Sequence, residues 1–170
     1  MLKYAGILLI ITGAGGFGTY CSSYLKMRLE QLVECREIFA ELNAEREYLR
    51  LPYAQLLKKT AKGKSFLFYD ILSEVAKAME ENSQADVERL WEKAFHKRAT
   101  QLLLKEEELD LLLALARSLL LEGNHTQMAK LYFIQLEDKI LQVMQEKKEK
   151  QKLYGTISVL GGLFLVILLL

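Results

Sequence analysis

Hydrophobic residues gather at the two ends of this 170-residue chain and recur at intervals among charged residues between them. No charged residue occurs between Lys3 and Lys26, and none follows Lys152. As a helix, residues 153–170 would span about 27 Å, close to the hydrocarbon thickness of a bilayer. A helix that is apolar on every face needs a large protein to bury it in a soluble fold. The pattern therefore predicts a transmembrane helix over residues 153–170.

A second apolar segment, residues 4–24, is rich in glycine. Glycine costs about 1 kcal/mol per residue in a soluble helix but is common in membrane helices, where it lets a second helix approach closely. Two alternatives are a cleaved signal peptide and a lipoprotein signal. The first would need a more basic start, and the second is disfavoured because bulky Tyr20 directly precedes Cys21. The sequence thus favours a retained transmembrane helix over residues 4–24.

Small residues spaced four apart occur in both predicted spans. One pair is Ala14 and Gly18, and the other is Ser158 and Gly162. Such a spacing gives a helix a face on which another helix can pack closely in a membrane. We predict that these faces mediate packing between the spans or between copies of the chain.

Basic residues flank the inner ends of both predicted spans. Lys26 and Arg28 follow the first span, and four lysines precede the second: Lys147, Lys148, Lys150 and Lys152. Beyond the outer ends stands only Lys3 with the amino terminus. The positive-inside rule therefore predicts a two-pass cell-membrane protein with residues 25–152 in the cytoplasm and both termini outside.

Between the spans, apolar residues recur at steps of three and four, and strand-like alternation is absent. Turn and capping signals separate six predicted helices, which begin near Tyr24, Pro52, Ser65, Val87, Lys105 and Thr126. Predicted core positions include Leu29, Leu32, Val33, Phe39, Ile71, Met79, Leu90, Trp91, Leu112, Phe133, Leu136 and Ile140. Such stripes can close one core, so we predict an all-α helical bundle of about six helices over residues 25–152.

Little in this region predicts chemistry. The chain has 23 Lys and Arg against 22 Asp and Glu, so binding to nucleic acid has no electrostatic support. His96 and His125 stand far apart, and Cys21 and Cys35 form neither a CxxC pair nor a zinc pattern. No phosphate-binding loop or nucleophile motif occurs. We therefore expect no enzyme, cofactor or metal site, and any ATP-driven work would come from a partner.

Two places are candidates for partner binding. The first is the corner after the first predicted helix, at the membrane-distal end of the bundle, where four charges gather: Glu45, Arg46, Glu47 and Arg50. Reversing exposed charges should cost about 0.5 kcal/mol or less each, yet such charges can strongly affect association. The second is Trp91. A lone tryptophan in a helix is usually a core residue, and the alternative is an anchor that faces a partner.

Four loose motifs follow one another along the chain. They are a Leu-x-x-Glu-x-x-Tyr segment followed by proline, a lone helix tryptophan, a leucine-rich helix ending in glycine, and a lysine-rich stretch leading into the second span. Their residues are Leu42, Glu45, Tyr48 and Pro52; Trp91; Leu119, Leu120, Gly123 and Gln127; and residues 154–162. In this order, and with the two spans, the chain resembles the stage III sporulation protein AB family of endospore-forming bacteria. One departure is that the family usually reads Glu-Ile-x-Tyr-Gly where this chain has Arg46 and Leu49.

The resemblance implies a function, which the spacing of apolar residues alone does not. Members of the family are membrane components of the multi-protein channel between mother cell and forespore, made in the mother cell. Their helical domain is similar to the cytoplasmic domain of the F platform protein of type II secretion. By that analogy the chain would dock a cytosolic ATPase, stage III sporulation protein AA, and join other channel subunits, with a homo-oligomer possible. The alternative is a membrane-tethered helical sensor or adaptor unrelated to secretion.

Overall fold

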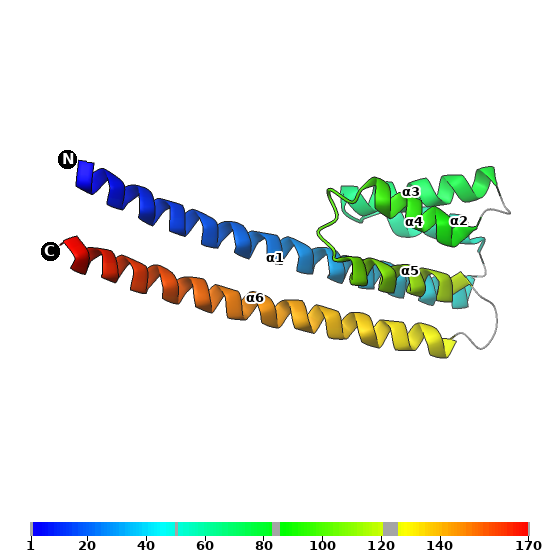
Figure 1. Ribbon diagram of the computed structural model, residues 1–170. Coiled ribbons are helices and arrows are strands. Elements are labelled where there is room, and N and C mark those ends of the chain that lie inside the picture. The colour runs from blue at the N-terminus through cyan, green and yellow to red at the C-terminus, as the bar shows by residue number, and fades with distance from the viewer. Residues whose placement is uncertain (1, 50, 83–85, 121–125, 170) are drawn as a thin grey trace. The chain divides into compact units, whose positions relative to one another are not determined.

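The computed structural model describes residues 2–49, 51–82, 86–120 and 126–169, and these are all-α, as the sequence predicts (Figure 1). Six helices occur in the described residues: α1 (Leu2–Leu49), α2 (Tyr53–Ala61), α3 (Phe66–Glu81), α4 (Val87–Lys97), α5 (Glu106–Leu120) and α6 (Thr126–Leu169). The chain divides into a central unit, Glu30–Ile140, and a terminal unit formed by Met1–Leu29 and Leu141–Leu170. Both α1 and α6 contribute residues to each unit.

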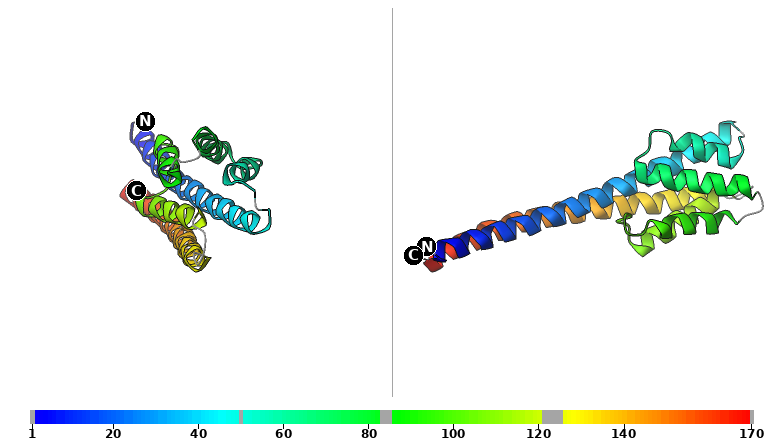
Figure 2. Two further views of the ribbon diagram at one scale, coloured as in Figure 1. Left: turned by 90° about the vertical axis from the view of Figure 1, so that its right-hand side faces the viewer. Right: turned by 90° about the horizontal axis from the view of Figure 1, so that it is seen from above.

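The core of the central unit is built on one face of α1. Leu32, Cys35, Ile38, Phe39 and Leu42 recur at steps of three and four, and none is more than 2% exposed. Burying a large apolar side chain contributes about 1.5–3 kcal/mol. The other helices add fully buried side chains, among them Leu56, Leu57, Ile71, Leu72, Leu112, Leu115 and Leu136. Along the chain, α2 packs on α3, α3 on α4, and α4 on α5 (Figure 2).

Some predicted core positions lie at the edge of these stripes rather than inside them. Leu29, Val33, Met79, Leu90 and Phe133 are only half-buried. An apolar stripe on a helix is wider than the strip that a neighbouring helix covers, so its flanking positions keep contact with solvent. These five predicted core positions are therefore only partly buried.

The hairpin of α2 and α3 follows the predicted turn signals. Pro52 is the N-cap of α2, and its carbonyl accepts the first hydrogen bonds of that helix. Gly63 has φ +94°, a conformation that residues with a side chain rarely adopt. Ser65 is the N-cap of α3, as predicted, but its side chain makes no capping hydrogen bond.

Caps also define α4 and α5. The side chain of Asp86, the N-cap of α4, accepts a hydrogen bond from the Glu88 N–H at 3.1 Å. At the start of α5, the Lys105 N–H donates to the buried Glu108 carboxylate at 2.8 Å. Helix α5 begins at Glu106, one residue after the predicted Lys105. Because a carboxylate lies in the first turn of each helix, both also interact favourably with the helix dipole.

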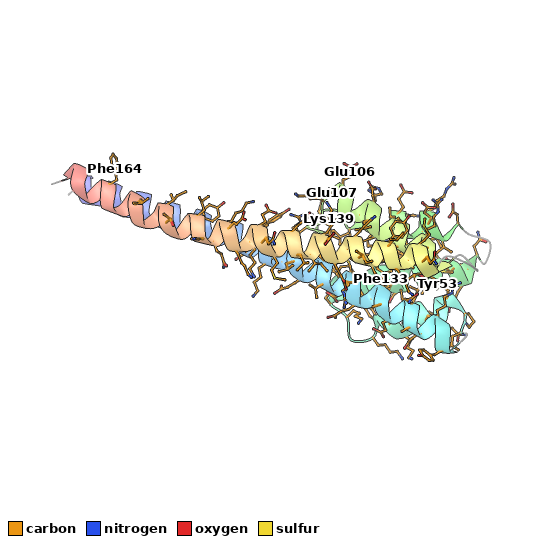
Figure 3. The ribbon with its side chains drawn as sticks, turned by 90° about the horizontal axis from the view of Figure 1, so that it is seen from below. Tyr53, Glu106, Glu107, Phe133, Lys139 and Phe164 are labelled. Atoms are coloured by element: carbon orange, nitrogen blue, oxygen red, sulfur yellow. The ribbon has the colours of Figure 1, made fainter. Side chains whose placement is uncertain are left out.

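Within the central unit, α6 is held by its buried face and by ion pairs. Ala129, Leu136 and Ile140 are buried. The Arg36 guanidinium of α1 lies 2.7 Å from the Glu137 carboxylate. The Lys139 ammonium lies 2.8 Å from the carboxylate of Glu107 in α5, and both residues are labelled in Figure 3. These exposed pairs contribute little energy each, about 0–1 kcal/mol, so burial is the main attachment of this part of α6.

The terminal unit contains the segments predicted to span a membrane. Residues 4–24 lie in α1 and most of residues 153–170 lie in α6, so both have helical backbones. The side chains of residues 1–22, and many in the second segment, lie outside the described residues. Where side chains are described, Leu25 and Val143 are buried. A search of the described part of the chain finds no helix that meets the length and hydropathy expected of a membrane span.

Candidate functional site

The predicted partner-binding corner lies where α1 ends and α2 begins, and Glu45 is its most enclosed charged group. The Lys59 ammonium forms an ion pair with Glu45 Oε1, and the Glu45 side chain is 17% exposed. Its second oxygen, Oε2, is buried, with no hydrogen-bond partner among the described residues. The prediction of an exposed charge is therefore wrong for Glu45, which ties α1 to α2 instead.

Tyr53 follows Pro52 and places a buried hydroxyl beside the same corner. Burial raises the pKa of Tyr53 well above its usual range, while the Trp91 N–H and the charge of Arg46 partly offset this effect. Within the described residues, neither the Tyr53 hydroxyl nor Trp91 Nε1 completes a hydrogen bond of good geometry. Tyr53 thus stays neutral at physiological pH. Sequence reasoning missed it, because a tyrosine after proline has no special pattern.

The outward face of the corner carries an aromatic side chain. Tyr48 is 84% exposed and Leu51 is 38% exposed. Exposed tyrosines are enriched among the residues that dominate protein–protein binding. Of the predicted charges, Arg46 is half-buried, whereas Arg50 and the side chain of Glu47 lie outside the described residues. The described part of the predicted docking corner therefore consists of Arg46, Tyr48 and Leu51.

Trp91, the second candidate, is 1% exposed. Its ring lies between Phe39 of α1 and Phe95 of α4, with centroid distances of 5.4 and 5.5 Å. Tilted aromatic pairs at this separation add about 0.5–1.5 kcal/mol beyond burial. In this conformation the indole holds α4 on α1, and a partner could reach it only if α4 moved.

A polar row on α1 fastens the loops and α2 to this helix. The Gln31 side-chain amide donates to the Gln101 carbonyl at 3.0 Å and accepts from the Leu103 N–H at 2.8 Å. One turn further on, Glu34 Oε1 accepts a hydrogen bond from the Ser65 N–H at 2.6 Å.

The same row continues to the docking corner. Glu41 lies 2.8 Å from the Lys64 ammonium, and Glu45 pairs with Lys59. Because Gln31, Glu34, Glu41 and Glu45 follow helical spacing, they occupy one face of α1. This face of α1 therefore holds α2 and the neighbouring loops through several polar contacts.

Residues with metal-binding or nucleophilic side chains do not gather in the described structure. No group of three His, Cys, Asp or Glu side chains in its residues could hold a metal ion. Cys35 is a buried thiol whose pKa is raised by burial and by the carboxylates of Glu34 and Glu108. His96 is exposed, 3.8 Å from Glu92, while His125 and the side chain of Cys21 lie outside the described residues.

The small-residue pairs of the predicted spans also lie outside the described side chains. This applies to Ala14 and Gly18 in α1 and to Ser158 and Gly162 in α6. Their role in packing stays a prediction.

The described residues thus define an all-α bundle protein with exposed residues where α1 ends and a row of polar contacts along one face of α1. The chain belongs to the stage III sporulation protein AB family, whose model matches residues 3–170. Membership implies a role in sporulation. A solved structure titled "Stage III sporulation protein AB (SpoIIIAB)" shares the fold, with a TM-score of 0.66, 20% identity, and coverage of 72% of this chain and 98% of that one. No curated protein matches the chain.

Proposed function

We propose that the chain is a non-enzymatic membrane platform subunit of the secretion-like channel between mother cell and forespore. Its central unit would dock a cytosolic ATPase of the secretion type, stage III sporulation protein AA. The observation that carries this proposal is membership of the family over residues 3–170. The exposed corner supports it, because a platform needs a surface that a partner can reach.

The proposal includes anchoring by two membrane helices, residues 4–24 and 153–170, with residues 25–152 in the mother-cell cytoplasm. Two observations support it. Basic residues flank the inner ends of both segments. Each segment also belongs to a helix without interruption, α1 from Leu2 and α6 to Leu169, and a continuous helix is stiffer than a flexible linker.

Within the docking corner, we assign distinct roles to its residues. Tyr48 is the contact residue, because its ring is 84% exposed and two rotatable bonds make it cheap to order on binding. Arg46 supplies charge, with Glu47 and Arg50 completing the predicted set. Glu45 is a positioning residue, since its pairing with Lys59 holds α2 against the end of α1, which carries Tyr48.

The test is a pull-down of the purified ATPase by the full chain in detergent. Tyr48→Ala and Arg46→Glu should each weaken binding by about tenfold or more. Phe66→Ala is the matched control, because Phe66 is another aromatic residue with 80% exposure, at the start of α3. It should bind the ATPase like the unmodified chain.

Two results would count against this assignment. If Tyr48→Ala and Arg46→Glu bind normally, the ATPase contacts another surface. If the unmodified chain captures no ATPase, and none co-purifies with it from sporulating cells, the chain acts as a tethered adaptor instead.

A further inference from the structure

Charge is divided unevenly between the two units of the chain. The central unit, Glu30–Ile140, carries 16 Lys and Arg against 20 Asp and Glu, a net charge of −4. The terminal unit, Met1–Leu29 with Leu141–Leu170, carries 7 Lys and Arg against 2 Asp and Glu, a net charge of +5. The near-neutral total of +1 conceals this separation.

The positive charge of the terminal unit is concentrated in two short stretches. Six of its seven basic residues form what we call the basic collar: Lys26, Arg28, Lys147, Lys148, Lys150 and Lys152. Within this unit, Arg28 of α1 lies 3.6 Å from Glu146 of α6, so the two stretches are neighbours. Lys148 and Lys152 are exposed and four residues apart, which places them on one face of α6.

The acidic residues of the collar region do not cancel these charges. Glu146 is engaged by both Arg28 and Lys150, the latter at 2.6 Å. In the part of the chain that the structure describes, Lys147, Lys148 and Lys152 form no ion pair with a carboxylate. These three lysines therefore keep their positive charge available for an external anion.

We infer that the basic collar binds the anionic head groups of phospholipids in the membrane that anchors the chain. This inference rests on the proposed membrane anchoring. Lysine clusters next to a membrane helix attract anionic lipid, and Lys152 directly precedes the predicted span. An aromatic residue lies close in sequence to each stretch of the collar, Tyr24 with 39% exposure and Tyr154 half-buried, and such residues are typical of a membrane interface.

The expected preference for anionic lipid depends on how many of the available lysines one lipid contacts. Each lysine near a charged bilayer surface raises association by about fivefold at moderate ionic strength. The attraction falls within a Debye length of about 10 Å at 0.1 M salt, so it acts only on lipids next to the collar. A mobile lipid contacts part of the collar at a time, and we therefore expect a preference of about fivefold for anionic over zwitterionic lipid.

The experiment uses the full chain reconstituted in phosphatidylcholine bilayers. Trace spin-labelled phosphatidylglycerol or spin-labelled phosphatidylcholine reports the fraction of lipid held at the protein. The triple variant K147Q/K148Q/K152Q should reduce the preference for phosphatidylglycerol to nearly one. The matched control K62Q/K93Q/K105Q removes three exposed lysines from the central unit and should keep the full preference.

The possible outcomes distinguish lipid binding by the collar from the proposed membrane anchoring. Loss of the chain from bilayers in alkaline carbonate would overturn the proposed anchoring. A chain that stays anchored but holds both lipids equally would overturn only the collar inference. The same conclusion follows if the collar variant keeps its preference, or if the control loses it to the same extent.

Discussion

The Glu34 carboxylate of α1 accepts a hydrogen bond of 2.6 Å from the Ser65 N–H, so a residue of one helix caps the start of another. The Ser65 side chain itself makes no capping hydrogen bond to the N–H groups of the first turn of α3. A backbone N–H at a helix start that lacks a hydrogen-bond acceptor lowers the stability of the fold. A carboxylate at this place also interacts favourably with the helix dipole. The cap of α3 is therefore a tertiary contact.

We expect Glu34→Ala to lower the free energy of unfolding by about 1–2 kcal/mol, because it removes this cap. Ser65→Ala is the matched control and should change stability by about 0.5 kcal/mol or less. Urea unfolding of both variants measures the difference. Equal losses in the two variants would show that the Ser65 hydroxyl is the cap after all.

The fragment of residues 25–152 should fold without the terminal segments and be almost wholly helical. Its buried side chains, such as Leu32, Ile71 and Leu112, all come from residues within the fragment. Circular dichroism measures the helical content. A spectrum dominated by coil or sheet would mean that the terminal segments are needed for folding.

Gly63 should be sensitive to replacement because of its backbone and not because of its surroundings. Its φ is +94°, and an added Cβ would meet no atom within 4 Å. Gly63→Ala should cost about 1–2 kcal/mol of stability, since the left-handed region is strained for residues with a side chain. Gly63→Asn should cost less, because asparagine tolerates this region. If thermal melts rank the two variants the other way, steric contact and not φ controls the turn.

Glu74 should make stability depend on pH at the α3–α4 interface. Partial burial raises the pKa of Glu74, but hydrogen bonds and charges from Arg98 and Lys97 outweigh it, so the net pKa is lowered. A carboxyl with a lowered folded-state pKa adds stability above its unfolded pKa of about 4.3, and this stability is lost as pH falls through the folded pKa.

Glu74→Gln should therefore be less stable than the unmodified chain at pH 7, and the difference should shrink as the pH falls below about 4.3. Urea unfolding between neutral and acid pH measures it. Glu81→Gln is the control, because the ion pair that Glu81 forms with Lys77 is long, at 3.9 Å, and both side chains are exposed. A constant difference for Glu74→Gln across this range would contradict the assignment.

Local signals in the sequence predict the helices well, because their causes are local. Pro52 and Gly63 define turns through their own backbone preferences, and Thr126 opens α6 as expected. The docking corner is predicted less well. Whether Glu45 is exposed depends on where Lys59 lies, and the cap of Ser65 comes from Glu34, which is 31 residues away. Contacts between residues far apart in sequence leave no periodic signal along the chain.

The predicted spans offer a last test, in which two adjacent glycines should behave differently. Gly162 shares a face of α6 with Ser158, four residues away, and this small-residue face would let a second membrane helix approach closely. Gly161 is exposed, and an added Cβ there would meet no atom within 4 Å. We therefore expect Gly162→Ile to reduce cysteine crosslinking between the spans by about tenfold. Gly18→Ile, on the face that Gly18 shares with Ala14, should have the same effect, while Gly161→Ile should crosslink normally.

Resistance to carbonate extraction should be unchanged in all three variants, which separates packing from insertion. Unchanged crosslinking in Gly162→Ile and Gly18→Ile would exclude these faces as the packing surfaces. The Arg28–Glu146 ion pair and the buried Leu25 and Val143 would then be the contacts that hold the two helices together.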